Sequence, residues 1–226
     1  MITKYSMKIK DIITEERLAD FYSDADRQCI NEAATIFARD CSPFFTEHQT
    51  GQPLYRGVTN NVVRINPYLF KVATEANRNP LDTPTINHNL ADKWLNDNVG
   101  GRFRSDHIAF CTGRQTTASA YGTVHIIVPI GDFSFCWSPL IRDMSNVLPK
   151  TGAVSAAAAL NDQLSDEEIR TGMVEHVLAR GRYQTTQLTS AIASLNEIML
   201  RCNQYYALRC GFEFYNAIIE EMQAIT

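Results

Sequence analysis

Residues 107–129 read HIAFCTGRQTTASAYGTVHIIVP and indicate the fold class more clearly than any other part of the chain. Its two ends, residues 107–112 and 123–129, are rich in β-branched and aromatic side chains and predict two strands. The residues between them, 116–121, predict one or two helical turns that end at Gly122. A block of β structure is therefore expected at the centre of the chain.

Further strands are expected on both sides of this block, at residues 53–57, 133–137, 196–201 and 205–209. Helices are expected where apolar residues recur at steps of three or four, at residues 12–40, 153–160, 166–179 and 212–225. One more helix should start at Pro84 and end at Gly100 and Gly101. Residues 41–53, which are polar and contain two prolines and a glycine, predict a loop.

Three helix starts carry capping signals. Thr14 suits the start of the first helix and Thr83 the start of the helix at Pro84. Ser165 with Glu168 predicts a capping box for residues 166–179. Helices at both ends with strands between them indicate an α+β fold rather than a regular βαβ alternation. We divide the chain into an N-terminal helical extension, residues 1–50, and a main domain, residues 51–226, that form one compact unit.

The composition is that of an ordinary globular protein: 45% of the 226 residues are hydrophobic and 20% are charged. No apolar stretch approaches the roughly 20 residues of a membrane span, and the basic N-terminus lacks the apolar segment of a secretory signal. The formal net charge of −4 argues against a large nucleic-acid surface, although it allows a small basic path. Six cysteines without a CxxC pair and five scattered histidines predict free thiols in a reducing cytoplasm and no metal site.

Three short segments contain the residues of chemical interest: Leu54-Tyr-Arg-Gly57, Ala109-Phe-Cys-Thr-Gly113 and Asn196-Glu-Ile-Met-Leu200. In this order they resemble the three active-site strands of ADP-ribosyltransferases of the Arg/Ser-Thr/Glu class, the cholera-toxin-like branch. The matching positions are Arg56, Phe110 with Thr112, and Glu197. Ala120-Tyr121-Gly122 and the region 78–143 are also similar to phage and bacterial proteins that contain this domain.

The resemblance implies an ADP-ribosyltransferase-like fold in residues 51–226, with a mixed β core around an NAD cleft. It implies an enzyme that transfers ADP-ribose from NAD, its substrate, to a protein or nucleic-acid acceptor and releases nicotinamide. No metal is required. A phage-encoded enzyme or toxin of this kind would act in the host bacterial cytoplasm, without a membrane, and an inhibitor or antitoxin is a further expected partner.

The chemistry of the family explains the residue types. Breaking the bond between nicotinamide and ribose develops positive charge on the ribose, and the carboxylate of Glu197 would stabilise it. Arg56 would clamp the anionic part of NAD through paired hydrogen bonds, and Gly57 would let the backbone approach the ligand. Thr112 would hold the site together by a hydrogen bond, with Glu197 as the expected partner. Phe110 and Tyr121 complete the expected NAD-binding residues.

One departure from the family concerns the acceptor. Members that modify arginine have a second Glu two residues before the catalytic Glu, and several other members have Gln there, but this chain has Leu195. Leucine cannot take a proton from an acceptor, so either Tyr183 or Gln184 replaces it or the enzyme hydrolyses NAD. The second segment also reads Cys-Thr-Gly instead of Ser-Thr-Ser, which leaves the role of Thr112 less defined.

Each of these residues also has an ordinary structural explanation. Arg56 would fit an ion pair at a strand end, Thr112 a strand interior and Glu197 a solvated surface, and a non-catalytic binding module would keep all three. Among weaker candidates, Arg102, Arg104, Arg180 and Arg182 fit either a phosphate site or a solvated face, and Phe103 and Phe133 fit either ligand stacking or the core. Cys111 lacks an assignable histidine partner and is expected to be structural.

Overall fold

The computed structural model describes residues 21–48, 51–58, 62–81, 83–160 and 163–225. The chain divides into two compact units, Met1–Arg39 with Cys210–Thr226, and Asp40–Arg209. The expected helix cap at Thr14 lies outside the described residues.

The first unit contains the expected first and last helices, α1 (Asp24–Asp40) and α9 (Phe212–Ile225). Helix α1 begins at Asp24, so the expectation of one continuous helix over residues 12–40 is wrong at residues 21–23. Ser23 explains this start, because its hydroxyl accepts a hydrogen bond from the backbone N–H of Asp26 at 3.2 Å. Within this unit, Tyr22 packs edge-on against Phe214 with ring centroids 5.3 Å apart.

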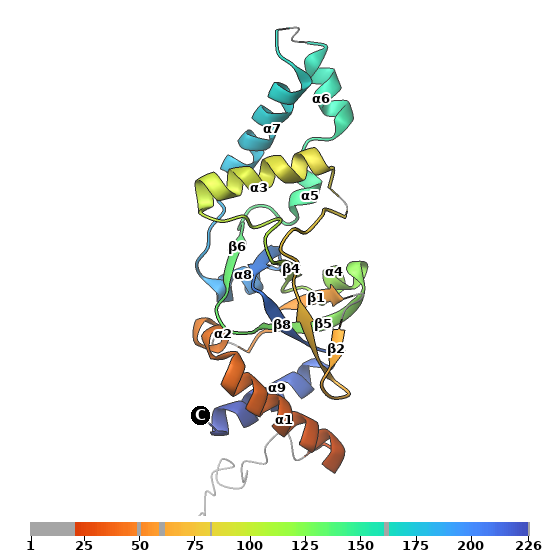
Figure 1. Ribbon diagram of the computed structural model, residues 1–226, viewed down its shortest axis with the longest axis vertical. Helices are drawn as coiled ribbons and strands as arrows, with labels where there is room; N and C mark the ends of the chain where they lie inside the picture. Colours follow the sequence, from red (N-terminus) through yellow and green to blue (C-terminus); the bar gives the residue numbers. More distant parts are fainter. Residues whose placement is uncertain (1–20, 49–50, 59–61, 82, 161–162, 226) are drawn as a thin grey trace, which may run out of the picture. The chain divides into compact units, whose positions relative to one another are not determined.

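The second unit is built on one eight-stranded sheet (Figure 1) with the strand order β2-β3-β8-β5-β1-β4-β7-β6. Its strands are β1 (Tyr55–Val58), β2 (Val62–Arg64), β3 (Leu69–Ala73), β4 (Ile108–Thr112), β5 (Thr123–Pro129), β6 (Ser134–Trp137), β7 (Glu197–Arg201) and β8 (Gln204–Leu208). Every strand pair is antiparallel. The expected mixed sheet is therefore wrong, because no helix serves as a crossover between two parallel neighbours.

The hairpin of β2 and β3 was not expected from the sequence. All three residues of β2 are exposed, so the strand lacks the apolar alternation that would have marked it. The turn is held by Asn66, whose side-chain oxygen accepts hydrogen bonds from the backbone N–H groups of Tyr68 and Leu69 at 3.0 and 2.8 Å. This local hydrogen bonding by an asparagine is a typical turn device.

The sheet has a weak point between β1 and β4. These strands share one registered pair, Tyr55 with Thr112, whereas β4 and β7 share five pairs that include Thr112 with Glu197. Beyond Tyr55 and Thr112 the two strands separate. Thr112 pairs with Tyr55 on one side and with Glu197 on the other. These pairs bring the ends of three strands from distant parts of the sequence to one place.

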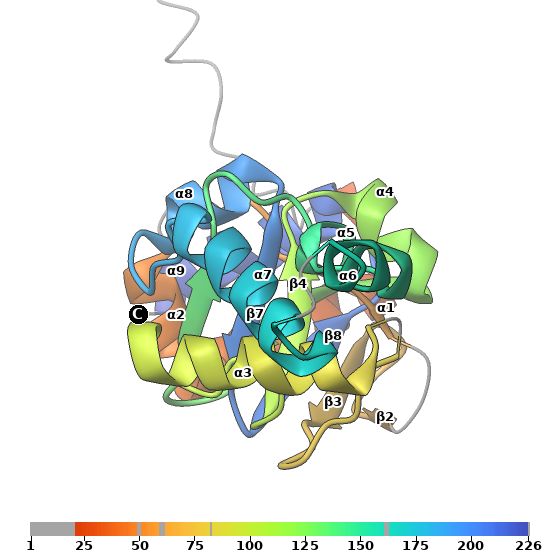
Figure 2. The ribbon, with the colours of Figure 1, turned by 90° about the horizontal axis from the view of Figure 1, so that it is seen from above.

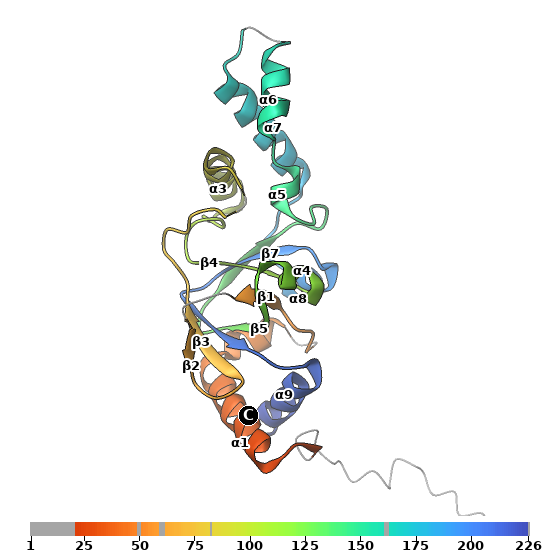
Figure 3. The same ribbon diagram turned by 90° about the vertical axis from the view of Figure 1, so that its right-hand side faces the viewer.

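The described helices of this unit, besides the one-turn 3₁₀ helix η3 (Ser119–Tyr121), are α2 (Ser42–Glu47), α3 (Thr85–Val99), α4 (Gln115–Ala118), α5 (Met144–Val147), α6 (Thr151–Ala158), α7 (Asp166–Arg180) and α8 (Leu188–Ser194). Helices α3, α5 and α7 pack with β4, β6 and β7 in one apolar core that includes Leu95, Met144, Leu178 and Met199. Seen from above, α3 and α7 lie side by side (Figure 2), and they are in contact. Helices α6 and α7 are in contact and lie side by side (Figure 3).

The helix ends test the capping predictions. The capping box of Ser165 and Glu168 is present, and Gly100 ends α3 in the left-handed conformation with φ of 91°. The cap at Thr83 is wrong: Pro84 occupies the cap position, and the Thr83 hydroxyl accepts a hydrogen bond from Arg104 instead. The loop predicted for residues 41–53 contains α2, which has a proline in its first turn.

Candidate active site

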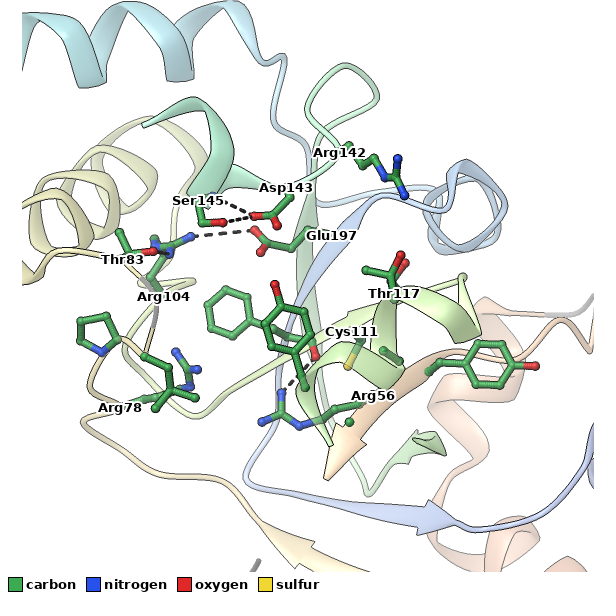
Figure 4. Close-up of a pocket in the computed structure, with 18 residues that line it drawn as sticks. Arg56, Arg78, Thr83, Arg104, Cys111, Thr117, Arg142, Asp143, Ser145 and Glu197 are labelled. Carbon is green, nitrogen blue, oxygen red and sulfur yellow. Dashed lines mark hydrogen bonds and ion pairs between the residues drawn. The ribbon is translucent and has the colours of Figure 1, made fainter. Parts of the chain in front are cut away.

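A cavity of about 180 Å³ lies where β1 and β4 separate (Figure 4). All six residues that the sequence singled out for catalysis or NAD binding line it: Arg56, Gly57, Phe110, Thr112, Tyr121 and Glu197. The lining also contains residues that the motifs did not indicate, among them Arg78, Thr83, Arg104, Arg142, Asp143 and Ser145. The registered pairs of β1, β4 and β7 therefore bring the three expected segments together.

Glu197 is the first residue of β7, and its side chain is only 20% exposed. Its backbone N–H donates to the carbonyl of Arg142 at 2.8 Å, and its carboxylate accepts a hydrogen bond from the backbone N–H of Met144. Burial raises the pKa of Glu197 to about 7, although Arg104 acts in the opposite direction. In Figure 4 the carboxylate is directed toward Arg104 and Asp143. Glu197 is therefore not the solvated surface residue that was the alternative explanation for it.

Arg56 lies on β1, just beyond the pair of Tyr55 and Thr112. Its Nη1 donates to the carbonyl of Phe110 at 3.0 Å. Its Nε is buried and has no hydrogen-bond partner among the described residues. The side chain also forms a hydrogen bond with Tyr205. The planar guanidinium has more N–H donors than these two bonds use, so further donors stay available to a ligand.

A second arginine stands beside Arg56. The guanidinium of Arg78 lies over the Phe110 ring, 4.5 Å from its centroid. Burial lowers the pKa of Arg78, and the nearby charges of Arg56 and Arg104 lower it further. These arginines repel one another in a poorly solvated space, an arrangement that an anionic ligand would relieve.

The hydroxyl of Thr112 does not bond to the carboxylate of Glu197, so that expectation is wrong. Its hydroxyl donates to the carbonyl of Leu195 at 3.0 Å and accepts from the backbone N–H of Arg114 at 3.2 Å. Leu195 adopts the left-handed conformation with φ of 62°, which is costly for a branched, bulky residue. Thr112 therefore fixes the strained turn from which β7 and Glu197 begin, which accounts for its place in the site.

Gly57 is required by close packing, whereas its expected role in admitting a ligand stays a prediction. A Cβ at this position would lie 2.5 Å from the carbonyl oxygen of Ala118 and 2.5 Å from the carbonyl carbon of Tyr121. The absence of a side chain at Gly57 thus lets the backbone of α4 and η3 pack directly on β1. This contact holds Tyr121, which is 49% exposed, at the edge of the cavity.

Several of the weaker candidates lie outside the cavity, although Arg104 and Cys111 line it. Tyr183 packs against Trp94 with ring centroids 6.3 Å apart, and the backbone of Gln184 is bonded to that of Trp137. Phe103 belongs to the core and Phe133 stacks on Phe135. None of these side chains lines the cavity. A role for Tyr183 or Gln184 in activating an acceptor stays a prediction.

Among the remaining polar residues of the lining, Arg104 was a weaker candidate from the sequence, whereas Asp143 and Ser145 were not marked by any motif. Asp143 caps α5, and its carboxylate accepts hydrogen bonds from the N–H and hydroxyl of Ser145 at 2.8 and 2.6 Å. Arg104 is 4% exposed, so a solvated face is wrong for it. Asp143 and Ser145 do form a recognisable capping pattern, which was the available signal for a fixed loop beside Glu197.

In the part of the chain that the structure describes, no cluster of three or more His, Cys, Asp or Glu is arranged to hold a metal ion. Nor does any helix of the described ranges combine the length and apolarity needed to cross a membrane. Comparison with protein-family models, with curated proteins and with solved structures finds no match to this chain. The case for a function therefore rests on the side chains of the cavity.

Proposed function

We propose that the protein transfers ADP-ribose from NAD to a macromolecular acceptor and releases nicotinamide. One observation carries the proposal: a carboxylate, Glu197, shares a single cavity with the arginines Arg56 and Arg78, and burial raises its pKa to about 7. NAD presents a matching pair of features, a diphosphate and a ribose that becomes positively charged in the transition state. Arginines bind a diphosphate well, and an ionised carboxylate stabilises a positively charged ribose.

The roles follow from position. Arg56 and Arg78 bind the diphosphate, since both guanidinium groups lie in the cavity and flank Phe110. Phe110 and Tyr121 offer aromatic faces to the rings of the substrate. Thr112 acts through the turn at Leu195 and positions Glu197, so it is a positioning residue rather than a catalytic one.

The proposed reaction breaks the bond between the nicotinamide nitrogen and C1′ of its ribose. The bonding electron pair leaves with nicotinamide, which becomes neutral, and positive charge appears on the ribose. The ionised carboxylate of Glu197 stabilises that charge more strongly than it stabilises the ground state. A nucleophilic atom of the acceptor then bonds to C1′ and gives up its proton to solvent.

The acceptor is either a macromolecule or water. Leu195 favours water as the second candidate, because a leucine two residues before Glu197 offers no carboxylate or amide to an incoming acceptor. An NAD glycohydrolase would release nicotinamide without labelling any macromolecule. A binding module that kept the fold would release none.

The proposal is tested with NAD labelled in its adenylate part, incubated with the protein and a bacterial lysate. Transfer predicts a labelled macromolecule together with free nicotinamide, and digestion with protease or nuclease then identifies the acceptor class. The matched control is Glu197→Gln, which has nearly the same shape and no negative charge. Equal labelling by the wild type and this variant, or no nicotinamide release by the wild type, would overturn the proposal.

A further inference from the structure

A third arginine of the cavity, Arg104, is placed differently from Arg56 and Arg78. It is 4% exposed, and its Nη1 lies 3.9 Å from Oε1 of Glu197. The same Nη1 donates to Sδ of Met144 at 3.0 Å, and Nη2 donates to the hydroxyl of Thr83 at 3.3 Å. Its cation therefore faces the carboxylate from the side of α3 and α5, as Figure 4 shows.

A buried aspartate holds the loop that carries this arginine. Asp92 on α3 accepts hydrogen bonds from the backbone N–H of Arg104 at 2.8 Å, from Nε of Arg102 at 2.9 Å and from the hydroxyl of Ser105 at 2.6 Å. Bonds of this kind to an ionised acceptor are among the stronger ones in proteins. The position of Arg104 is thus fixed by the protein before any ligand arrives.

The other groups that influence Glu197 do not replace Arg104. Asp143 is a second carboxylate and raises the pKa of Glu197, whereas Arg78 lowers it less than Arg104 does. Burial raises the pKa of the Tyr183 hydroxyl and of the Cys136 thiol, so both stay neutral. His88, next to Arg104, is also neutral, because burial lowers its pKa to about 4.

From this geometry we infer that Arg104 is a positioning residue that favours the ionised form of Glu197 near neutral pH and directs its carboxylate into the cavity. The inference rests on the proposed function for its catalytic consequence, but the pairing of the two side chains is a property of the protein alone. A buried carboxylate beside Asp143 would otherwise hold its proton and could not oppose positive charge on a ribose. The contact at 3.9 Å is longer than a hydrogen bond, so Arg104 acts here through its charge.

Two other roles for Arg104 make different predictions. A residue that binds phosphate would change the affinity for NAD and leave the titration of Glu197 unaltered. A residue that only supports the fold would change the melting temperature and leave the titration unaltered. The pH at which Glu197 ionises therefore separates the three roles.

The experiment measures that pH directly, without NAD. Protein labelled with ¹³C at the glutamate carboxyl carbons is titrated by NMR, and Glu197→Gln assigns the signal. The wild type should titrate near pH 7. Arg104→Met should raise the midpoint by about one pH unit or more, because removing an opposite charge at this distance has an effect of that size.

Arg104→Lys keeps the charge and should stay within about half a unit of the wild type. The matched control Arg78→Met, which removes an arginine that lies over Phe110, should stay within the same range. The pH profile of nicotinamide release should shift with the NMR midpoint, in kcat rather than in KM. An unchanged midpoint in a folded Arg104→Met protein would overturn the inference, and so would equal shifts in Arg104→Met and Arg78→Met.

A second measurement needs no variant that might not fold, since it uses the wild type. The guanidinium carbon of Arg104, followed by NMR, should shift with the same midpoint as Glu197, and a signal that stays constant through that range would contradict the pairing. Should the protein release no nicotinamide, the proposed function would fail while both NMR measurements would still decide the role of Arg104.

Discussion

At the scale of single residues, the proposed chemistry depends on the groups that surround the carboxylate of Glu197. Glu197 is bonded through its backbone to Arg142, and its carboxylate is bonded to Met144 and faces Arg104. This environment excludes most water but supplies fixed donors and one cation. Such preorganised groups stabilise developing charge without needing to reorient during a reaction.

Arg56→Lys tests the proposed clamp. Lysine keeps the charge but loses the planar pair of donors, so NAD affinity should fall by about 10-fold or more. Isothermal titration calorimetry with NAD measures this. The melting temperature serves as the control, because the bond from Arg56 to the carbonyl of Phe110 also has a structural part. A folded variant with wild-type affinity and turnover would remove Arg56 from the site.

Leu195 leads to a prediction about the acceptor. The wild type should modify free arginine analogues poorly, since the residue two places before Glu197 offers no general base, and Leu195→Glu should improve that activity. Mass spectrometry of an analogue such as agmatine, incubated with NAD and each protein, measures the product. Efficient modification by the wild type would show that another residue activates the acceptor.

At the scale of elements, the sequence predicted best where one pattern acts alone. Strand β5 has the expected bounds, and α7 has the expected capping box. Helices α2, α5 and α8 and the hairpin of β2 and β3 were not expected, because they are short and follow from local caps, turns and packing rather than from a long apolar period. A helix or strand must be long enough to repeat its apolar pattern before the sequence predicts it.

The residues of the candidate site also divide into those that the sequence predicted and those that it did not. Arg56, Thr112 and Glu197 were predictable because each lies in a strand motif, and strand pairing brought those motifs together. Arg78 and Arg104 come from the long connections between strands, where no motif marks a position. Their place depends on tertiary contacts, such as that of Asp92 with the loop of Arg104, which a single sequence does not reveal.

Two glycines give a matched test of how the elements pack. Gly57→Ala should destabilise the protein by about 1–3 kcal/mol, because its Cβ would meet the backbone of Ala118 and Tyr121. Gly172→Ala, in the interior of α7 with open space around the added carbon, should stabilise it by roughly 0.5–1 kcal/mol. Chemical denaturation measures both. Equal effects of the two substitutions would contradict the close contact between β1 and η3.

At the scale of the whole molecule, the charge of the cavity is opposite to that of the protein. The chain has a formal net charge of −4, yet four arginines and two carboxylates are among the residues that line the cavity. A positive cavity on a negative protein concentrates small anionic ligands there while it disfavours polyanions elsewhere on the surface. A dinucleotide substrate fits that distribution.

The raised pKa of Glu197 links stability to pH. The folded protein holds this proton up to about pH 7, whereas the unfolded chain releases it near the ordinary value of 4.5. Unfolding is therefore favoured by ionisation as the pH rises between these values, and stability falls through that window. The fall corresponds to about 3 kcal/mol once the pH exceeds both values.

Glu197→Gln should abolish this part of the pH dependence, since glutamine resembles the protonated acid. The variant should be more stable than the wild type at pH 8 and nearly equal to it at pH 4. Free energies of unfolding from urea titrations at the two pH values measure the difference. A variant that is less stable than the wild type at pH 8 would show that the ionised carboxylate supports the fold.

Nicotinamide release by the wild type and by Glu197→Gln, with NAD affinity measured on both proteins, decides whether Glu197 is the catalytic carboxylate. The account predicts that the variant binds NAD within about 3-fold of the wild type, because the ribose carries no charge in the ground state. It predicts a fall in kcat of roughly 100- to 1000-fold, the usual effect of removing one preorganised electrostatic partner. A folded Glu197→Gln protein that binds NAD and releases nicotinamide at the wild-type rate would contradict the claim that Glu197 is the catalytic carboxylate.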